Sequence, residues 1–213
     1  MPLRTEPSRS TALERLRTPL TPADLRGATY LRTYPSLMAI CDGHRLTHDR
    51  FQLVCLAAYG WMPRILRLDA AYLDAAVAAA AAAQGHSLDD PAMEELDIAS
   101  LVACLHSNVG ASKVLHAVNP AVFPILDASI DRLLVRAGPA RTWRREPADR
   151  YRDYLAYVHG LRTADWFGPY CDALRAAYRD RLHALGIPDY PITEVRLIEA
   201  ALFEIARAGP AAE

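Results

Sequence analysis

Apolar residues recur every three or four positions through most of this sequence, which is the spacing of one face of an α-helix. The clearest examples are residues 147–161, 169–185 and 194–205. No segment alternates apolar and polar residues over the length of a strand. The nearest candidate is 122–126, where the proline at 124 disfavours pairing in a sheet. The pattern therefore predicts an all-α protein, a bundle of about nine or ten helices.

Capping residues and helix breakers set the predicted boundaries. Thr47 and Thr193 each precede an apolar segment and are expected N-caps. Thr21-Pro22 is expected to open a helix that Pro35 then disrupts. Further helices are expected at 10–18, around Ile65 and Leu66, at 70–84 after Asp69, and at 91–105 after Asp90-Pro91.

The domain organisation follows from the same pattern. Residues 1–9 lack helical periodicity and are expected to form a mobile tail. Residues 10–213 are expected to form a single all-α domain, with two lobes as the alternative. The segment 106–136 is expected to be its functional centre.

The charge balance narrows the class of partner. The net charge is −1, so no global basic field points to nucleic acid. The charges are nevertheless uneven: residues 68–112 hold seven acids and no Lys or Arg, whereas residues 128–183 hold eleven Arg against seven acids. A nucleic-acid-binding face, if there is one, is expected in the second segment.

The sequence offers no pattern for a metal, a cofactor or a membrane. The four cysteines are far apart and form no CxxC pair, so we expect reduced, buried thiols in a cytoplasmic protein. His44 and His48 lie one turn apart, but they flank a helix start and make a weak metal pair. No signal peptide and no apolar run of membrane-spanning length is present.

Two residues of segment 106–136 carry candidate chemistry. Lys113 is the only lysine among 24 basic residues. A lysine can lose its proton when partly buried and then act as a nucleophile, which arginine cannot do; the alternative is a stray solvated side chain. Asp127 follows the apolar run 122–126 and is expected at a helix N-terminus, either as a catalytic carboxylate or as a simple N-cap.

The same segment resembles the helix-hairpin-helix DNA glycosylases of base-excision repair. The residues 105–110 (Leu-His-Ser-Asn-Val-Gly) occupy the place of that family's Leu-Pro-Gly-Val-Gly turn, and 123–127 (Phe-Pro-Ile-Leu-Asp) resemble its segment with a catalytic Asp. The second match is closest to the adenine glycosylase branch. The segments 59–63 and 195–198 resemble an uncharacterised bacterial branch with the same helical core.

The sequence departs from the family in four respects. Asn108 replaces the first hairpin glycine, and asparagine tolerates a left-handed backbone less freely than glycine does. The link from Gly110 to Asp127 is about one helical turn shorter than the family pattern. Ser112 stands where bifunctional members have their lysine, so Lys113 is rotated by roughly 100° on the helix. The family's iron–sulfur cysteines are absent.

The resemblance implies a nucleic-acid-acting protein, a base-excision glycosylase, in which Asp127 stabilises charge on the sugar and Lys113 forms a Schiff base. The alternative is a non-catalytic helical scaffold that binds a protein or small-ligand partner. Candidate site residues on the first hypothesis are Asn108, Gly110 and Ser112 at the hairpin, Arg132, Arg136, Arg141, Arg144 and Arg145 for phosphates, and Trp61, Tyr59 and Trp143 for base stacking. Each has a structural alternative: Tyr59 and Trp61 as core residues, His106 and His116 as ordinary structural histidines, and Arg141–Arg145 as a solvated loop.

Overall fold

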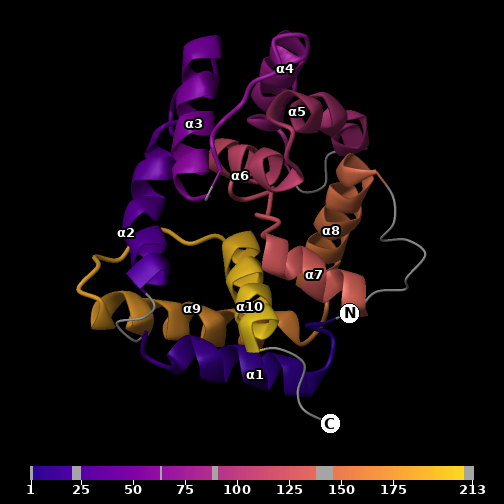
Figure 1. The fold of residues 1–213 in the computed structure, drawn as a ribbon. Helices are drawn as coiled ribbons and strands as arrows, with labels where there is room; N and C mark the ends of the chain where they lie inside the picture. The colour runs from indigo at the N-terminus through magenta and orange to yellow at the C-terminus, as the bar shows by residue number, and fades with distance from the viewer. Residues whose placement is uncertain (1, 21–24, 63, 88–90, 138–145, 209–213) are drawn as a thin grey trace. The chain divides into compact units, whose positions relative to one another are not determined.

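Helices make up almost all of the regular structure in the computed structural model, which describes residues 2–20, 25–62, 64–87, 91–137 and 146–208. Within these ranges the chain forms ten α-helices and no strand (Figure 1), which confirms the all-α fold class. The α-helices are α1 (Glu6–Arg17), α2 (Leu25–Ala39), α3 (His48–Gly60), α4 (Leu73–Ala83), α5 (Ile98–Leu105), α6 (Asn108–Val118), α7 (Ala128–Ala137), α8 (Pro147–Arg162), α9 (Phe167–Ala184) and α10 (Glu194–Ala208). A short 3₁₀-helix, η2 (Pro91–Glu95), precedes α5.

The predicted threonine caps are confirmed. The Thr47 hydroxyl accepts a hydrogen bond from the Arg50 amide at 3.3 Å at the start of α3. The Thr193 hydroxyl accepts one from the Arg196 amide at 3.1 Å at the start of α10. Gly186 follows α9 with a φ of 62°, a left-handed conformation that ends helices and favours glycine.

Three predicted boundaries are wrong. Pro35 lies inside α2, whose neighbouring residues Tyr34 and Leu37 are buried, so packing outweighs the single hydrogen bond that proline removes. Residues 64–69 are not helical, and α4 begins at Leu73. The Asp69 carboxylate accepts from the Ala71 amide at 2.9 Å, which turns the chain before the helix can start.

The third boundary is the predicted helix 91–105. It is divided into η2 and α5, because Asp97 caps a new helix by accepting from the Ser100 amide at 3.0 Å.

The predicted mobile tail, residues 1–9, is also wrong. Leu3 is fully buried, and its amide donates to the Tyr157 hydroxyl at 3.0 Å. Helix α1 already begins at Glu6, with Pro7 in its first turn. A few residues that lack periodicity can still be ordered when one apolar side chain docks into a core.

The chain divides into two compact units. Unit 1 comprises Met1–Thr33, Asp127–Arg145 and Ala156–Glu213, and unit 2 comprises Tyr34–Leu126 and Glu146–Leu155. In unit 1, α1 packs against α9 and α10, and α7 packs against α10. In unit 2, α6 packs against α3, α4 and α5. Helices α2 and α8 each contribute residues to both units.

A buried ion pair joins the three long helices of unit 1. Arg181 of α9 and Glu204 of α10 approach at 2.5 Å, with both side chains almost fully buried. The same guanidinium donates to the Arg15 carbonyl of α1. Because a buried charge is costly without partners, this pair specifies how α1, α9 and α10 pack.

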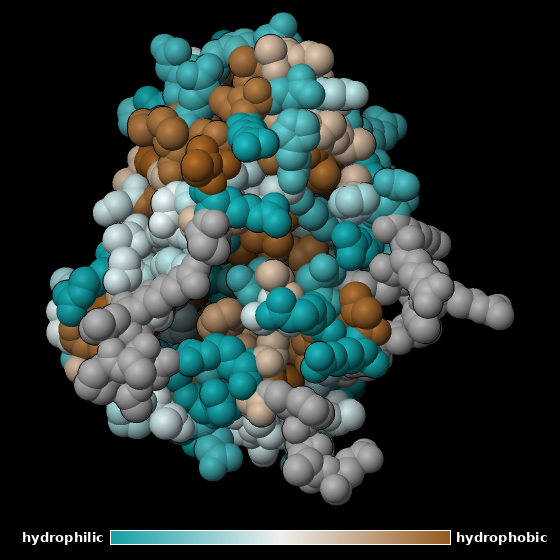
Figure 2. All heavy atoms as spheres, viewed as in Figure 1, coloured by the Kyte–Doolittle hydropathy of each residue, from teal (hydrophilic) through white to brown (hydrophobic). Residues whose placement is uncertain are grey.

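Helix α3 of unit 2 has two large apolar side chains on its exposed face. Leu53 and Leu56 are 52% and 60% exposed, while Phe51, Val54 and Cys55 on the opposite face are fully buried. In Figure 2 hydrophobic residues reach the surface in the upper left, over the region of α3. Among the described residues, no helix has both the length and the hydropathy needed to cross a bilayer.

Candidate functional site around the α5–α6 hairpin

A two-residue turn joins α5 to α6. His106 caps α5 with a left-handed backbone (φ 48°), and the Ser107 hydroxyl caps α6 by accepting from the Gly110 amide at 3.0 Å. Asn108 is the first residue of α6, so the left-handed backbone of this turn is at His106. Both amide atoms of the Asn108 side chain are buried and have no hydrogen-bond partner among the residues that the structure describes.

Gly110 allows α6 to approach α3 closely. A Cβ at this position would lie 2.9 Å from the Tyr59 hydroxyl oxygen and 3.0 Å from a ring carbon of the same residue. That hydroxyl donates to the Leu105 carbonyl at 2.7 Å, at the end of α5. Tyr59 therefore ties α3 to the hairpin, and glycine is needed at 110 to make room for its ring.

Lys113 is buried, with only 5% of its surface exposed. Its Nζ donates to the Trp61 carbonyl at 3.3 Å and lies 5.8 Å from the centroid of the Trp61 ring. The Trp61 ring is in turn 6.2 Å from the Tyr34 ring. The alternative of a solvated lysine is excluded, because the amine lies among aromatic side chains of unit 2.

His116 of the same helix is a structural histidine. It is fully buried, its Nδ1 lies 2.6 Å from the Phe123 carbonyl oxygen, and its Nε2 lies 2.9 Å from the Tyr34 hydroxyl. Since a carbonyl only accepts, Nδ1 carries the hydrogen, and in the neutral ring Nε2 accepts from Tyr34. Both nitrogens are engaged, and no group of three or more potential metal ligands occurs in the described parts of the chain.

The extended link 123–126 is fixed by side chains from α6 and α8. His116 donates to the Phe123 carbonyl, as described. The Tyr151 hydroxyl donates to the Pro124 carbonyl at 2.8 Å, and the Tyr154 hydroxyl donates to the Ile125 carbonyl at 3.2 Å. The Leu126 amide donates to the Ser112 hydroxyl at 3.0 Å. Four consecutive residues that form no sheet therefore each have a partner for a backbone polar group.

At Asp127 the chain passes from unit 2 into unit 1. Its carboxylate accepts from the Ser129 amide at 2.7 Å, and its carbonyl accepts from the Asp131 amide at 2.9 Å, at the start of α7. The side chain is half-buried. Asp127 therefore caps α7, which was the alternative to a catalytic role. A capping carboxylate still has a second oxygen that can make other contacts.

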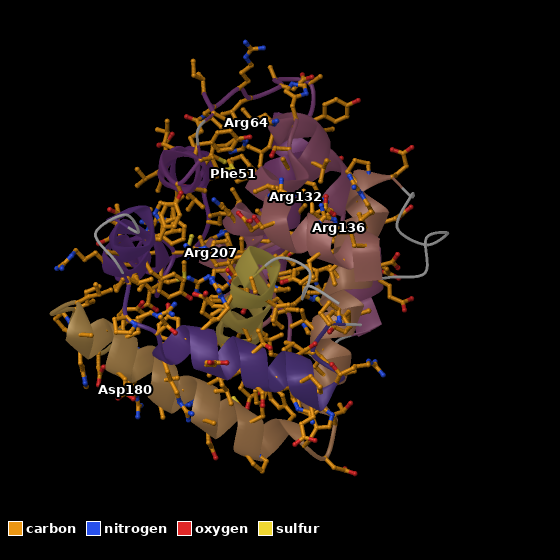
Figure 3. All side chains as sticks on the ribbon, turned by 60° about the horizontal axis from the view of Figure 1, so that its bottom comes forward. Phe51, Arg64, Arg132, Arg136, Asp180 and Arg207 are labelled. Atoms are coloured by element: carbon orange, nitrogen blue, oxygen red, sulfur yellow. The ribbon has the colours of Figure 1, made fainter. Side chains whose placement is uncertain are left out.

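The remaining candidates fall into three groups. Arg132 and Arg136 are exposed one turn apart on α7, and Figure 3 labels both; Arg132 also donates to the Ser129 hydroxyl at 3.1 Å. Tyr59 and Trp61 are 6% and 8% exposed, so they are core residues of unit 2. The candidates Arg141, Trp143, Arg144 and Arg145 lie outside the described residues.

Sequence reasoning missed three tyrosines that shape this region, Tyr34, Tyr151 and Tyr154. Their hydroxyls contact His116 and the carbonyls of Pro124 and Ile125. The helical spacing of residues 147–161 predicts that Tyr151 and Tyr154 face the core, and both are buried. What it does not predict is the partners of their hydroxyls. The available signal was the tyrosine hydroxyl itself, since a buried tyrosine requires a hydrogen-bond partner.

No protein-family model matches this chain, and no curated protein or solved structure matches it either.

Proposed function

We propose that this protein acts on nucleic acid as a DNA glycosylase of the helix-hairpin-helix kind, with Lys113 as nucleophile and Asp127 as the assisting carboxylate. The burial of Lys113 is the observation that carries the proposal. Lys113 is the single lysine among the 24 lysine and arginine residues of the chain. Its side chain lies in an aromatic environment, and only 5% of the residue's surface is exposed. A buried lysine can give up its proton and act as a nucleophile, which an arginine at the same place could not do.

The hairpin geometry supports the same proposal. Helix α6, which carries Lys113, begins directly after the turn formed by His106 and Ser107. Ser107 caps the helix, and Asn108 is its first residue. The Asn108 amide atoms, buried without a partner, are suited to a hydrogen-bonding ligand.

The chemistry assigned to these residues is nucleophilic substitution at the sugar. The unprotonated Nζ of Lys113 attacks C1′, the glycosidic C–N bond breaks, and the bonding electron pair leaves with the base, which takes up a proton. The lysine nitrogen then passes a proton to the ring oxygen O4′ as the C1′–O4′ bond breaks, which leaves a protonated imine between Nζ and C1′. Water hydrolyses this imine and restores the amine. The ionised Asp127 stabilises the positive charge that develops on the sugar.

Borohydride trapping tests the role of Lys113. The full chain is incubated with duplex DNA that holds an abasic site or a damaged base, and borohydride reduces any imine to a stable adduct. We expect an adduct with the wild type and none with Lys113→Arg, which keeps the cation but cannot form an imine. Adding Arg179→Lys, an exposed position on α9, to the Lys113→Arg chain controls for trapping by a surface lysine and is expected to restore nothing.

Two variants separate the catalytic role of Asp127 from its capping role. Asn caps a helix as well as Asp does, so Asp127→Asn is expected to change the unfolding free energy by less than ~0.5 kcal/mol. Asp127→Ala is expected to cost about 1 kcal/mol. Base release should nevertheless fall about 10²-fold in both variants, because both lose the charge. Full activity in Asp127→Asn would show that Asp127 acts only as a helix cap and not in catalysis.

The rival function, a non-catalytic scaffold, makes the opposite prediction for the same assays. It requires no adduct, no base release across a panel of lesions, and no salt-dependent binding of duplex DNA by the wild type. That combination of results would overturn the glycosylase proposal.

A further inference from the structure

The residues predicted to stack on a base, Tyr59 and Trp61, are core residues, so contact with a base requires other apolar side chains. Two exposed ones lie on the loop 64–72, which precedes α4. Ile65 is 87% exposed and Tyr72 is 44% exposed. Single exposed apolar residues are common on protein surfaces, so it is the place of these two in the molecule that indicates a role.

The loop is tied to the candidate site at both of its ends. Trp61, which ends α3, accepts a hydrogen bond from the Lys113 Nζ at its carbonyl (3.3 Å). Near the other end, the Asp69 amide donates to the Cys104 carbonyl at 2.9 Å, in the last turn of α5. The loop therefore runs from the residue that binds the amine to the helix that leads into the hairpin.

The loop also brings positive charge to the hairpin. Segment 64–68 contains two exposed arginines, Arg64 and Arg67, and no acidic residue. Burial raises the pKa of the Tyr59 phenol, and the Arg64 charge is among the groups that oppose this shift. Arg64 thus lies near the hydroxyl that donates to the Leu105 carbonyl at the end of α5. Figure 3 labels Arg64 near the top of the view.

From these positions we infer that the loop 64–72 binds the unpaired nucleotides of a single strand next to the hairpin. Arginine binds the phosphates of any nucleic acid, whereas the faces of bases are open to side chains only where the bases are unpaired and unstacked. A surface that combines exposed arginines with exposed apolar and aromatic side chains therefore fits a single strand. Arg64 and Arg67 contact phosphates, and Ile65 and Tyr72 lie against base faces.

A nucleic acid is favoured over a protein or a lipid surface, because the loop is bonded to Lys113 and to the helix before the hairpin. The inference thus rests on the proposed action on nucleic acid, but not on the imine chemistry. It narrows the substrate to a base in an unpaired stretch, such as a single strand, a bulge or a bubble of mismatches.

Binding of labelled oligothymidine of about 12 nucleotides to the full chain, followed by fluorescence anisotropy, tests the base contacts. Tyr72→Ala is expected to weaken binding at least about fivefold through lost stacking, whereas Tyr72→Phe keeps the ring and should bind like the wild type. Ile65→Ala is expected to weaken binding about threefold through lost apolar contact. Leu53→Ala, also exposed (52%) but on α3, is the matched control and should change nothing.

The same variants with a blunt duplex of equal length should differ by less than about twofold, since paired bases offer no open faces. Thermal melting of Tyr72→Ala checks that the variant is folded.

The arginines are tested through the salt dependence of oligothymidine binding. Arg64→Ala combined with Arg67→Ala is expected to lower the slope of log affinity against log salt by about 1.4, about 0.7 for each phosphate of a single strand. Arg17→Ala combined with Arg179→Ala removes two exposed arginines outside the loop and should leave the slope unchanged.

The outcomes separate this inference from the glycosylase chemistry. Equal oligothymidine binding by the wild type, Tyr72→Phe and Tyr72→Ala would overturn the inference, whatever the trapping assay shows. Binding that depends on Tyr72 without an imine at Lys113 would support the loop and contradict only the chemistry. Binding of phosphatidylserine vesicles that is lost in Tyr72→Ala, with no binding of oligothymidine, would assign the loop to a lipid surface and refute the inference.

Discussion

Gly110 shows, at the scale of single residues, how a sequence motif can have a packing cause. Its place in the sequence resembles the second glycine of a phosphate-binding hairpin. In the structure its amide donates to the Ser107 hydroxyl, and its missing side chain makes room for the Tyr59 ring. The glycine is therefore required by the contact between α3 and α6 whether or not a nucleic acid binds.

Gly110→Ala is expected to lower the free energy of unfolding by about 1–3 kcal/mol, because the added methyl would overlap the Tyr59 ring and disturb its bond to Leu105. Gly160→Ala is the matched control, since Gly160 lies in α8 with nothing within 4 Å of its Cβ position. That variant is expected to be more stable by up to about 1 kcal/mol through helix propensity. Urea denaturation of both variants measures the difference, and equal effects would refute the packing role.

At the scale of elements, the link 123–126 is an extended segment that is not paired in a sheet. Its backbone groups bond to Ser112 and His116 of α6 and to Tyr151 and Tyr154 of α8. Two helices thus hold an extended segment that has no secondary structure of its own. This explains why an apolar run with a central proline can be fully buried.

Tyr151→Phe is expected to cost about 1–3 kcal/mol of stability, because the buried Pro124 carbonyl loses its donor. Tyr72→Phe is the control, since Tyr72 is 44% exposed and is expected to stay within about 0.5 kcal/mol. Urea denaturation of both variants, followed by circular dichroism, measures the two values. An unchanged midpoint in Tyr151→Phe would show that the link does not depend on this bond.

The N-cap of α5 predicts a pH dependence. Hydrogen bonds from the side chain and backbone of Ser100 hold the pKa of Asp97 below its ordinary value, and Arg152 lowers it further. The unfolded chain therefore binds more protons than the native chain at acid pH. Asp97 stabilises the fold at neutral pH, and this contribution is lost as the pH falls below about 4 and through the lowered native pKa.

Replacing Asp97 with Asn tests this dependence, because Asn still caps the helix but does not titrate. The stability difference between wild type and Asp97→Asn is expected to shrink as the pH is lowered from about 7 to about 3. Urea denaturation at each pH supplies the values. A difference that is the same at every pH would disprove the link between the cap and the acid sensitivity.

At the scale of the whole molecule, a net charge of −1 gives no general attraction to DNA. Binding would depend on local groups of arginines. Arg132 and Arg136, exposed one turn apart on α7, form such a group. Their contribution is measurable apart from catalysis, because each phosphate contact adds to the salt dependence of binding.

Replacing Arg132 and Arg136 together with Ala is expected to weaken duplex binding and to lower the slope of log affinity against log salt by about 2. Arg17→Ala with Arg179→Ala removes two exposed arginines from α1 and α9 and serves as the control. Fluorescence anisotropy at several salt concentrations gives both slopes. Identical slopes in the two double variants would show that Arg132 and Arg136 of α7 do not contact DNA phosphates.

Interactions between neighbouring residues were enough to predict several local features of this protein. It predicted an all-α fold, the caps at Thr47 and Thr193, and the start of α8 at Pro147. These depend on interactions within one turn of helix, so neighbouring residues suffice to predict them. The helix through Pro35 and the order at Leu3 escaped prediction, because the burial of Tyr34 and Leu37 beside Pro35, and of Leu3 itself, overrode local preference.

The environment of the candidate site depends instead on contacts between distant parts of the chain. Lys113 is buried by Trp61, 52 residues away, and Gly110 is required by Tyr59 of another helix. The left-handed turn residue is His106, because Asn108 already belongs to α6. Contacts between residues far apart in sequence depend on how whole helices pack, and periodicity along the chain records which face is buried but not what lies against it.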